Sequence, residues 1–205
     1  MAERDSILLG TLAHVPFDGW SKAALTAGTL DAGFGENMAL RAFPGGLTDL
    51  AEHMADWADR QMLGVLAGLD MDAMRVRDRI AAGVKARLQV MEPHREALRR
   101  LLAYLALPLN APMTAKLSWR TVDAIWYAAG DDAADFNYYT KRSLLLPVYT
   151  TTLLYWLNDE AEGHTASWDY LDRRITDVLK IPAIKARIQK VLASLPGPFS
   201  AFRRA

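Results

Sequence analysis

The residues with the best spacing for chemistry form a small acidic and histidine group in the stretch TDLAEHMADW. Asp49, His53 and Asp56 are four and three residues apart, so on a helix they share one face. Such a group resembles part of a metal site, but a catalytic metal needs further ligands and supporting hydrogen bonds. A solvated polar helix face explains the same spacing equally well. We therefore expect neither a metal nor another cofactor.

Signatures of other enzyme classes are missing from the sequence. There is no cysteine, and His14, His94 and His164 lie in separate segments. The chain contains no GxSxG motif, no P-loop and no complete GxGxxG motif. We predict a protein that is not an enzyme.

The composition indicates a single globular domain with an uneven distribution of charge. The 205 residues include 24 basic and 24 acidic side chains and are 51% hydrophobic. Residues 1–60 carry nine acidic and four basic side chains, whereas six basic and no acidic residues follow Asp177. The N-terminal stretch MAERDSILLGTLAHV lacks the pattern of a secretory or transit peptide. We expect an intracellular, bacterial protein.

Helical periodicity dominates the chain and predicts an all-α fold. The first helix should end at Pro16 and Gly19, and Ser21 is placed to cap the second. We expect helices at about 3–14, 21–30, 36–43, 48–68, 72–90, 93–107, 112–128, 135–158, 165–180 and 181–195. They divide into a head (1–46), a body (47–180) and a C-terminal helix with a basic tail (181–205).

Three short helices before a long one resemble the layout of the TetR family, whose helix-turn-helix head binds DNA. The candidate recognition helix, about 35–43, offers only Glu36, Asn37 and Arg41 to a duplex. Affinity for DNA comes mostly from Lys and Arg contacts to phosphates, and this end of the chain is acidic. We expect a degenerate head that serves as scaffold and binds no nucleic acid. The alternative is a TetR-type regulator that senses an apolar ligand.

Residues 143–157 form an uncharged, apolar segment. Fifteen helical residues reach about 22 Å, too short for a bilayer core of about 30 Å, so the segment should be a buried helix. Pro147 should kink it, and hydroxyls from Thr150 to Thr152 could compensate the carbonyls that the proline frees. The helix lines a hydrophobic cavity in one interpretation and is ordinary core in the other.

The last helix is amphipathic and basic. Its aliphatic side chains fall within an arc of about 100°, and no acidic residue interrupts its polar face. This pattern is typical of a membrane-surface helix, although a helix docked on its own core or in a dimer seam would look similar. The candidate membrane-binding residues are Ile184, Lys185, Arg187, Ile188, Lys190, Val191, Leu192 and Leu195.

The stretch WYAAGDDAADFNYYTKR, residues 126–142, followed by an apolar run and by SWDYLDRR, residues 167–174, is more specific. It resembles a motif of the ubiquinone-biosynthesis accessory family called Coq nine. Tyr138 stands where that family often has tryptophan, and Lys141 replaces an arginine.

The resemblance implies a dimeric TetR-like protein that holds a lipid, reaches the membrane through its C-terminal helix and is not an enzyme. It implies presentation of an isoprenoid quinone precursor to a pathway enzyme such as the demethoxyubiquinone hydroxylase. We therefore predict a cytoplasmic protein associated with the inner face of the bacterial membrane. The expected lipid-binding residues are Trp126, Leu144, Leu145, Val148, Tyr149, Leu153 and Trp156. The expected partner-binding residues are Asp135, Tyr138, Tyr139 and Arg142.

Overall fold

The computed structural model describes the backbone of residues 1–131 and 136–194, and the side chains of residues 1–131 and 137–180. Within these ranges the protein is helical and has no strand, as predicted. The α-helices are α1 (Ala2–Asp18), α2 (Lys22–Asp31), α3 (Asn37–Ala42), α4 (Leu47–Ala67), α5 (Val76–Val90), α6 (Arg95–Leu105), α7 (Ala111–Ala128), α8 (Phe136–Leu157) and α9 (Thr165–Ser194). Short 3₁₀ turns lie at Glu92–His94, Pro108–Asn110 and Glu162–His164.

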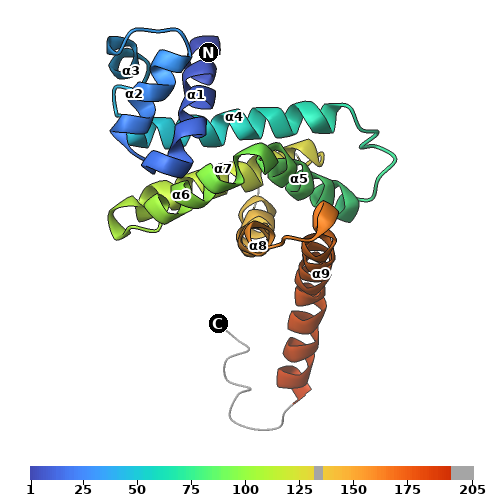
Figure 1. The fold of residues 1–205 in the computed structure, drawn as a ribbon. Coiled ribbons are helices and arrows are strands. Elements are labelled where there is room, and N and C mark those ends of the chain that lie inside the picture. The colour runs from blue at the N-terminus through green and yellow to red at the C-terminus, as the bar shows by residue number, and fades with distance from the viewer. Residues whose placement is uncertain (132–135, 195–205) are drawn as a thin grey trace.

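Helices α1, α2 and α3 form a head at one end of the long helix α4 (Figure 1). The Ser21 hydroxyl accepts a hydrogen bond from the Ala24 amide at 3.2 Å, which confirms the predicted cap. A Cβ on Gly28 would lie 2.1 Å from the Thr11 amide, so glycine permits the close crossing of α1 and α2. The predicted end of α1 is confirmed at Gly19, which is its C-cap, and is wrong at Pro16. The helix includes Pro16 and runs to Asp18, because a proline in the last turns removes only one backbone bond.

In the body, α5 and α7 pack against α4, and α8 packs against α7 on the side away from α4. Helix α9 packs against α8 and extends away from the body (Figure 1). Each body helix contributes fully buried apolar side chains to one continuous core. Representative members, all at most 1% exposed, are Met54, Val84, Leu88, Ile125 and Trp156. The buried residues of α8 recur every three or four positions, so they lie on one face of the helix. The opposite face is exposed, with Leu154 at 55% and Tyr155 at 42%. The expectation that the whole apolar run is buried is therefore wrong.

Helix α8 continues through Pro147. The Thr150 hydroxyl donates to the Leu146 carbonyl at 2.9 Å, and the Thr151 hydroxyl donates to the Pro147 carbonyl at 2.6 Å. The carbonyl that Pro147 leaves without a backbone partner belongs to Ser143, and neither hydroxyl bonds to it. The prediction that the threonines compensate for the proline is therefore wrong for these two hydroxyls.

The C-terminal region contains one helix where two were predicted. Helix α9 runs without interruption from Thr165 to Ser194 and includes Pro182, so the predicted boundary at 180/181 falls inside a continuous element. Loss of a single backbone bond at Pro182 does not end the helix. Among the described residues, no helix is long and apolar enough to cross a membrane.

Candidate functional site

An apolar cavity of about 290 Å³ lies where α5, α7, α8 and α9 meet. Its floor is aliphatic and buried, and its edge includes the exposed side chains of Val76 and Leu179. The lining residues are Val76, Arg77, Ile80, Trp126, Lys141, Leu144, Leu145, Val148, Ile175, Val178 and Leu179. The volume is near the lower end of the roughly 300–1,000 Å³ typical of small-molecule sites.

The structure brings together four of the seven predicted lipid-binding residues and places three elsewhere. Trp126, Leu144, Leu145 and Val148 line the cavity. The other three belong to two different parts of the core.

Tyr149 and Leu153 line a different, smaller space of about 60 Å³ on another side of α8. Trp156 is fully buried, with the Arg95 guanidinium 4.9 Å from its ring centroid.

Tyr149 lies beside a buried polar cluster in the centre of the body. The Arg87 guanidinium pairs with Asp59 at 2.8 Å, and the Thr121 hydroxyl donates to the same carboxylate at 2.9 Å. Burial raises the pKa of the Tyr149 phenol, so this side chain stays neutral. The cluster satisfies charges that would otherwise destabilise the core.

The motif that precedes α8 has a clear structural role. Gly130 ends α7 with a φ of 85°, a conformation that favours glycine. The chain then reaches Asp131, whose side chain is 6% exposed and accepts from Lys141 at 2.5 Å and from Arg142 at 2.9 Å. Burial alone would raise the pKa of Asp131, but these bonds outweigh it and lower the pKa below its usual value.

Arg142 is buried behind the aromatic surface rather than exposed on it. Its side chain is 3% exposed and also pairs with Asp123 at 2.5 Å. Its guanidinium lies 3.5 Å from the ring centroid of Tyr138 and donates to the carbonyl of the same residue at 3.2 Å. Arg142 therefore holds Tyr138 in place.

Tyr138 and Tyr139 form the accessible part of the predicted partner surface. Tyr138 borders an open hollow with Leu63 of α4 and Tyr127 of α7, and the Tyr127 side chain is 75% exposed. Tyr139 is 61% exposed, with its ring centroid 5.0 Å from that of Tyr138. We call Tyr127, Tyr138 and Tyr139 the aromatic patch. The fourth predicted residue, Asp135, lies outside the described residues.

The group Asp49, His53 and Asp56 does not form a metal site. Asp49 accepts from the Gly45 amide at 2.6 Å, and Asp56 accepts from Arg60 at 2.9 Å. His53 pairs instead with Asp5 of α1 at 2.8 Å. Each member therefore has a different structural partner, and the described part of the chain holds no group of three potential metal ligands.

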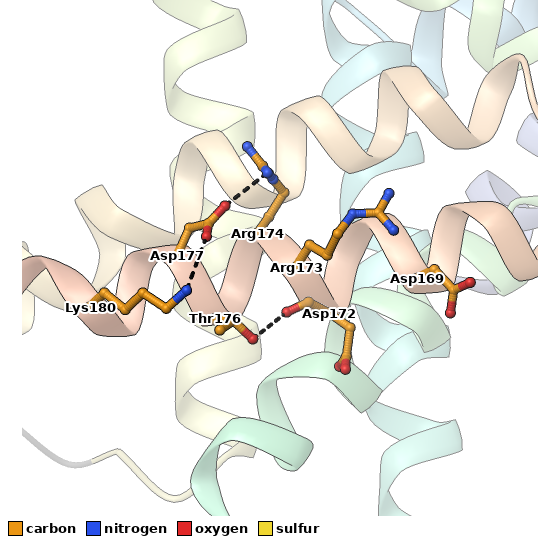
Figure 2. A pocket seen from close by; sticks show the side chains of 7 residues that line it. All are labelled: Asp169, Asp172, Arg173, Arg174, Thr176, Asp177 and Lys180. Atoms are coloured by element: carbon orange, nitrogen blue, oxygen red, sulfur yellow. Dashed lines mark hydrogen bonds and ion pairs between the residues drawn. The ribbon is translucent and has the colours of Figure 1, made fainter.

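The polar face of α9 carries a shallow hollow, shown in Figure 2. Asp177 pairs with Arg174 at 2.8 Å and lies 3.8 Å from Lys180, while Asp172 pairs with Arg77 at 2.8 Å. All seven lining side chains come from this one helix, so the hollow has no opposite wall. It is a solvated charged surface. The predicted membrane-binding side chains, from Ile184 to Leu195, lie beyond the side chains that the structure describes.

The head offers little to a nucleic acid. Helix α3, the candidate recognition helix, has six residues and a single cation, Arg41. Its exposed surface includes Leu40, which is 72% exposed. One cation in this helix offers few phosphate contacts, and the absence of nucleic-acid binding stays a prediction.

The fold has a counterpart among solved structures. The structure resembles the crystal structure of a TetR transcriptional regulator from Nitrosomonas europaea, with a TM-score of 0.71 and 18% sequence identity. The match covers 87% of this chain and 99% of the other. The predicted TetR-like fold is confirmed.

The sequence comparisons then identify the family that the chain resembles. The COQ9 family model matches residues 111–182, which contain most of the cavity wall and the aromatic patch. The mitochondrial ubiquinone biosynthesis protein COQ9 of Drosophila melanogaster is 28% identical over 100% of this chain and 61% of its own length. Those of Rattus norvegicus and Homo sapiens are 31% and 30% identical over 85% of this chain, and over 58% and 57% of their own lengths. The predicted resemblance to this family is confirmed.

The chain spans about three fifths of the length of these curated relatives. Their names give a biosynthetic pathway, that of ubiquinone.

Sequence reasoning did not assign a role to Arg77, Asp123 or Lys141. Their partners, Asp172, Arg142 and Asp131, lie 95, 19 and 10 residues away in the chain. No local pattern marks such pairs. The one available signal was the motif itself, which places Asp131 shortly before Lys141 and Arg142.

Proposed function

We propose that the protein is a non-catalytic, lipid-binding accessory protein of ubiquinone biosynthesis. The observation that carries this proposal is the apolar cavity at the junction of α5, α7, α8 and α9. It lies largely within the segment matched by the COQ9 family model, and the curated relatives are named for this pathway. The cavity holds an isoprenoid quinone precursor.

The aromatic patch is the surface through which the ligand is presented to a pathway enzyme, such as the demethoxyubiquinone hydroxylase. Exposed tyrosines are typical anchors of protein interfaces because they bury much apolar area and keep a polar tip. Tyr138 is held by Arg142, so the patch is ordered before a partner arrives.

Two further features complete the proposal. The basic amphipathic segment 181–195 docks on the inner face of the membrane, where the apolar ligand resides. The chain forms a homodimer, as the resemblance of the motif at residues 126–142 to the family implies.

Ubiquinone content in cells that depend on this protein tests the proposal. Tyr138→Ala combined with Tyr139→Ala should lower ubiquinone severalfold, because truncating interface anchors commonly costs at least about 2 kcal/mol of binding free energy. Tyr155→Ala removes a comparably exposed tyrosine from another face of α8 and serves as the control. Normal ubiquinone in the double variant, with protein at the wild-type level, would contradict the patch assignment.

A further inference from the structure

The apolar cavity contains an uneven set of charged groups. Among the described side chains, its lining includes two cations, Arg77 and Lys141, and no carboxylate. Arg77 pairs outside the cavity with Asp172 on α9 at 2.8 Å. Lys141 also pairs with a carboxylate outside the lining, but unlike Arg77 its charged group lies over an aromatic ring of the cavity wall, that of Trp126.

The Lys141 ammonium is held in position but retains bonding capacity. It donates to Asp131 at 2.5 Å and lies 5.4 Å from the ring centroid of Trp126, another lining residue. An ammonium has three N–H donors, and a carboxylate oxygen and an aromatic face do not use them all. The described residues therefore leave at least one donor for an oxygen of a ligand.

The position of Lys141 also fixes the orientation of a ligand. The Lys141 side chain is 39% exposed, and the lining residues Val76 and Leu179 are also exposed. Ile80, Leu145, Val148 and Ile175 are all at most 5% exposed. An apolar chain is thus best accommodated on the buried side, and a polar head at the accessible rim beside Lys141.

We propose that Lys141 is the head-group contact of the cavity, and that it selects an amphiphile with an apolar chain and an oxygen-acceptor head. This inference rests on the proposed function and specifies the ligand class of the same site. The matching chemistry is a ring or chain that bears carbonyl, hydroxyl or carboxylate oxygens. A plain hydrocarbon makes no use of the ammonium, and an amphiphile with a cationic head is repelled by it.

Asp131 is the positioning residue for this contact. One of its oxygens holds Lys141 in the cavity wall, and the other holds Arg142 beneath Tyr138. The same ion-pair network therefore contacts the head of a bound ligand, through Lys141, and the aromatic patch, through Arg142. This arrangement places the ligand head near the surface that a partner enzyme would contact.

Two probes of similar shape test the proposal: a decyl-substituted benzoquinone and decylbenzene, which has the same chain but no oxygen. Binding to the full chain is measured by native mass spectrometry. In Lys141→Met the apolar stem remains and the ammonium is lost, so affinity for the quinone should fall about tenfold. Affinity for decylbenzene should not change.

Lys85→Met is the matched control, because Lys85 also lies over a tryptophan, 5.2 Å from the Trp168 ring, but does not line the cavity. It should change neither affinity. Asp131→Asn should lower the ratio of the affinity for the quinone to the affinity for decylbenzene. A general loss of stability would weaken binding of both probes and leave this ratio unchanged.

Unchanged quinone binding in Lys141→Met, or equal weakening of both probes, would overturn the assignment of Lys141 while leaving the cavity itself intact. Failure of the wild-type chain to bind either probe would instead overturn the proposed function together with this inference. The two failures are therefore distinguishable.

Discussion

The carboxylate of Asp131 and the guanidinium of Arg142 lie 2.9 Å apart, with side-chain exposures of 6% and 3%. The pair joins the turn after α7 to the first turns of α8, and it lies between the cavity wall and the aromatic patch. Two residues of the family-like motif thus act mainly on the inside of the protein, where they hold the groups that a ligand and a partner would contact.

Removal of this carboxylate should destabilise the protein. Asp131→Ala leaves Arg142 buried with a single remaining carboxylate, Asp123, so the free energy of unfolding should fall by about 3 kcal/mol. Urea denaturation followed by circular dichroism measures the change. Asp177→Ala, which breaks a pair on the exposed face of α9, should leave the midpoint nearly unchanged. Similar midpoints for the two variants would contradict the structural role of Asp131.

The stability of the protein should decrease as the pH falls from about 7 to 5. Burial lowers the pKa of both His53 and His94, so the unfolded chain binds these protons at a higher pH than the folded chain does. The stabilisation from these two neutral histidines is fully present above about pH 6.5, the pKa of histidine in the unfolded chain. It is lost as the pH falls below that value.

Urea unfolding at both pH values checks this dependence. The variant His53→Gln/His94→Gln should lose stability less steeply with decreasing pH than the wild-type protein. A second loss should follow below about pH 4, because hydrogen bonding from Arg60 lowers the pKa of Asp5 and its protonation breaks the contact between α1 and α4. Identical slopes for the wild-type protein and the double variant between pH 7 and 5 would refute the histidine assignment.

Much of the fold could be predicted from local sequence, since helix periodicity, the Ser21 cap and the apolar run of α8 are local signals. The errors arose at prolines. Pro16 and Pro182 lie inside helices because each removes a single backbone bond, a cost that neighbouring packing or helix propensity can offset.

The candidate site was only partly predictable for a different reason. Apolarity indicated burial of the whole run 143–157, but one face of α8 is exposed. Apolarity also did not show which neighbour each residue would meet, so Leu144, Leu145 and Val148 were grouped with Tyr149 and Leu153, which face another side. The exposure of Arg142 could not be inferred either, because its partners Asp123 and Asp131 become close only after α7 and α8 pack.

Deletion of the residues after Lys180 should weaken binding to anionic vesicles about a hundredfold. Lys185, Arg187 and Lys190 each contribute roughly 1 kcal/mol near an anionic surface, or about 3 kcal/mol together. Co-sedimentation of the intact and shortened chains measures the difference. Replacing the three cations by glutamine should reproduce most of the loss on anionic vesicles and little on neutral ones. Equal sedimentation of the shortened chain would exclude this segment as the membrane contact.

The central claim is that the cavity holds an isoprenoid lipid, and mass spectrometry of lipids extracted from gently purified protein tests it most directly. The account predicts a quinone precursor near one per chain in the wild-type protein. Leu144→Trp, which fills the cavity, should lose it, and Leu154→Trp, at an exposed position of the same helix, should retain it. Equal lipid content in Leu144→Trp and the wild-type protein, or a wild-type protein without isoprenoid, would contradict the claim.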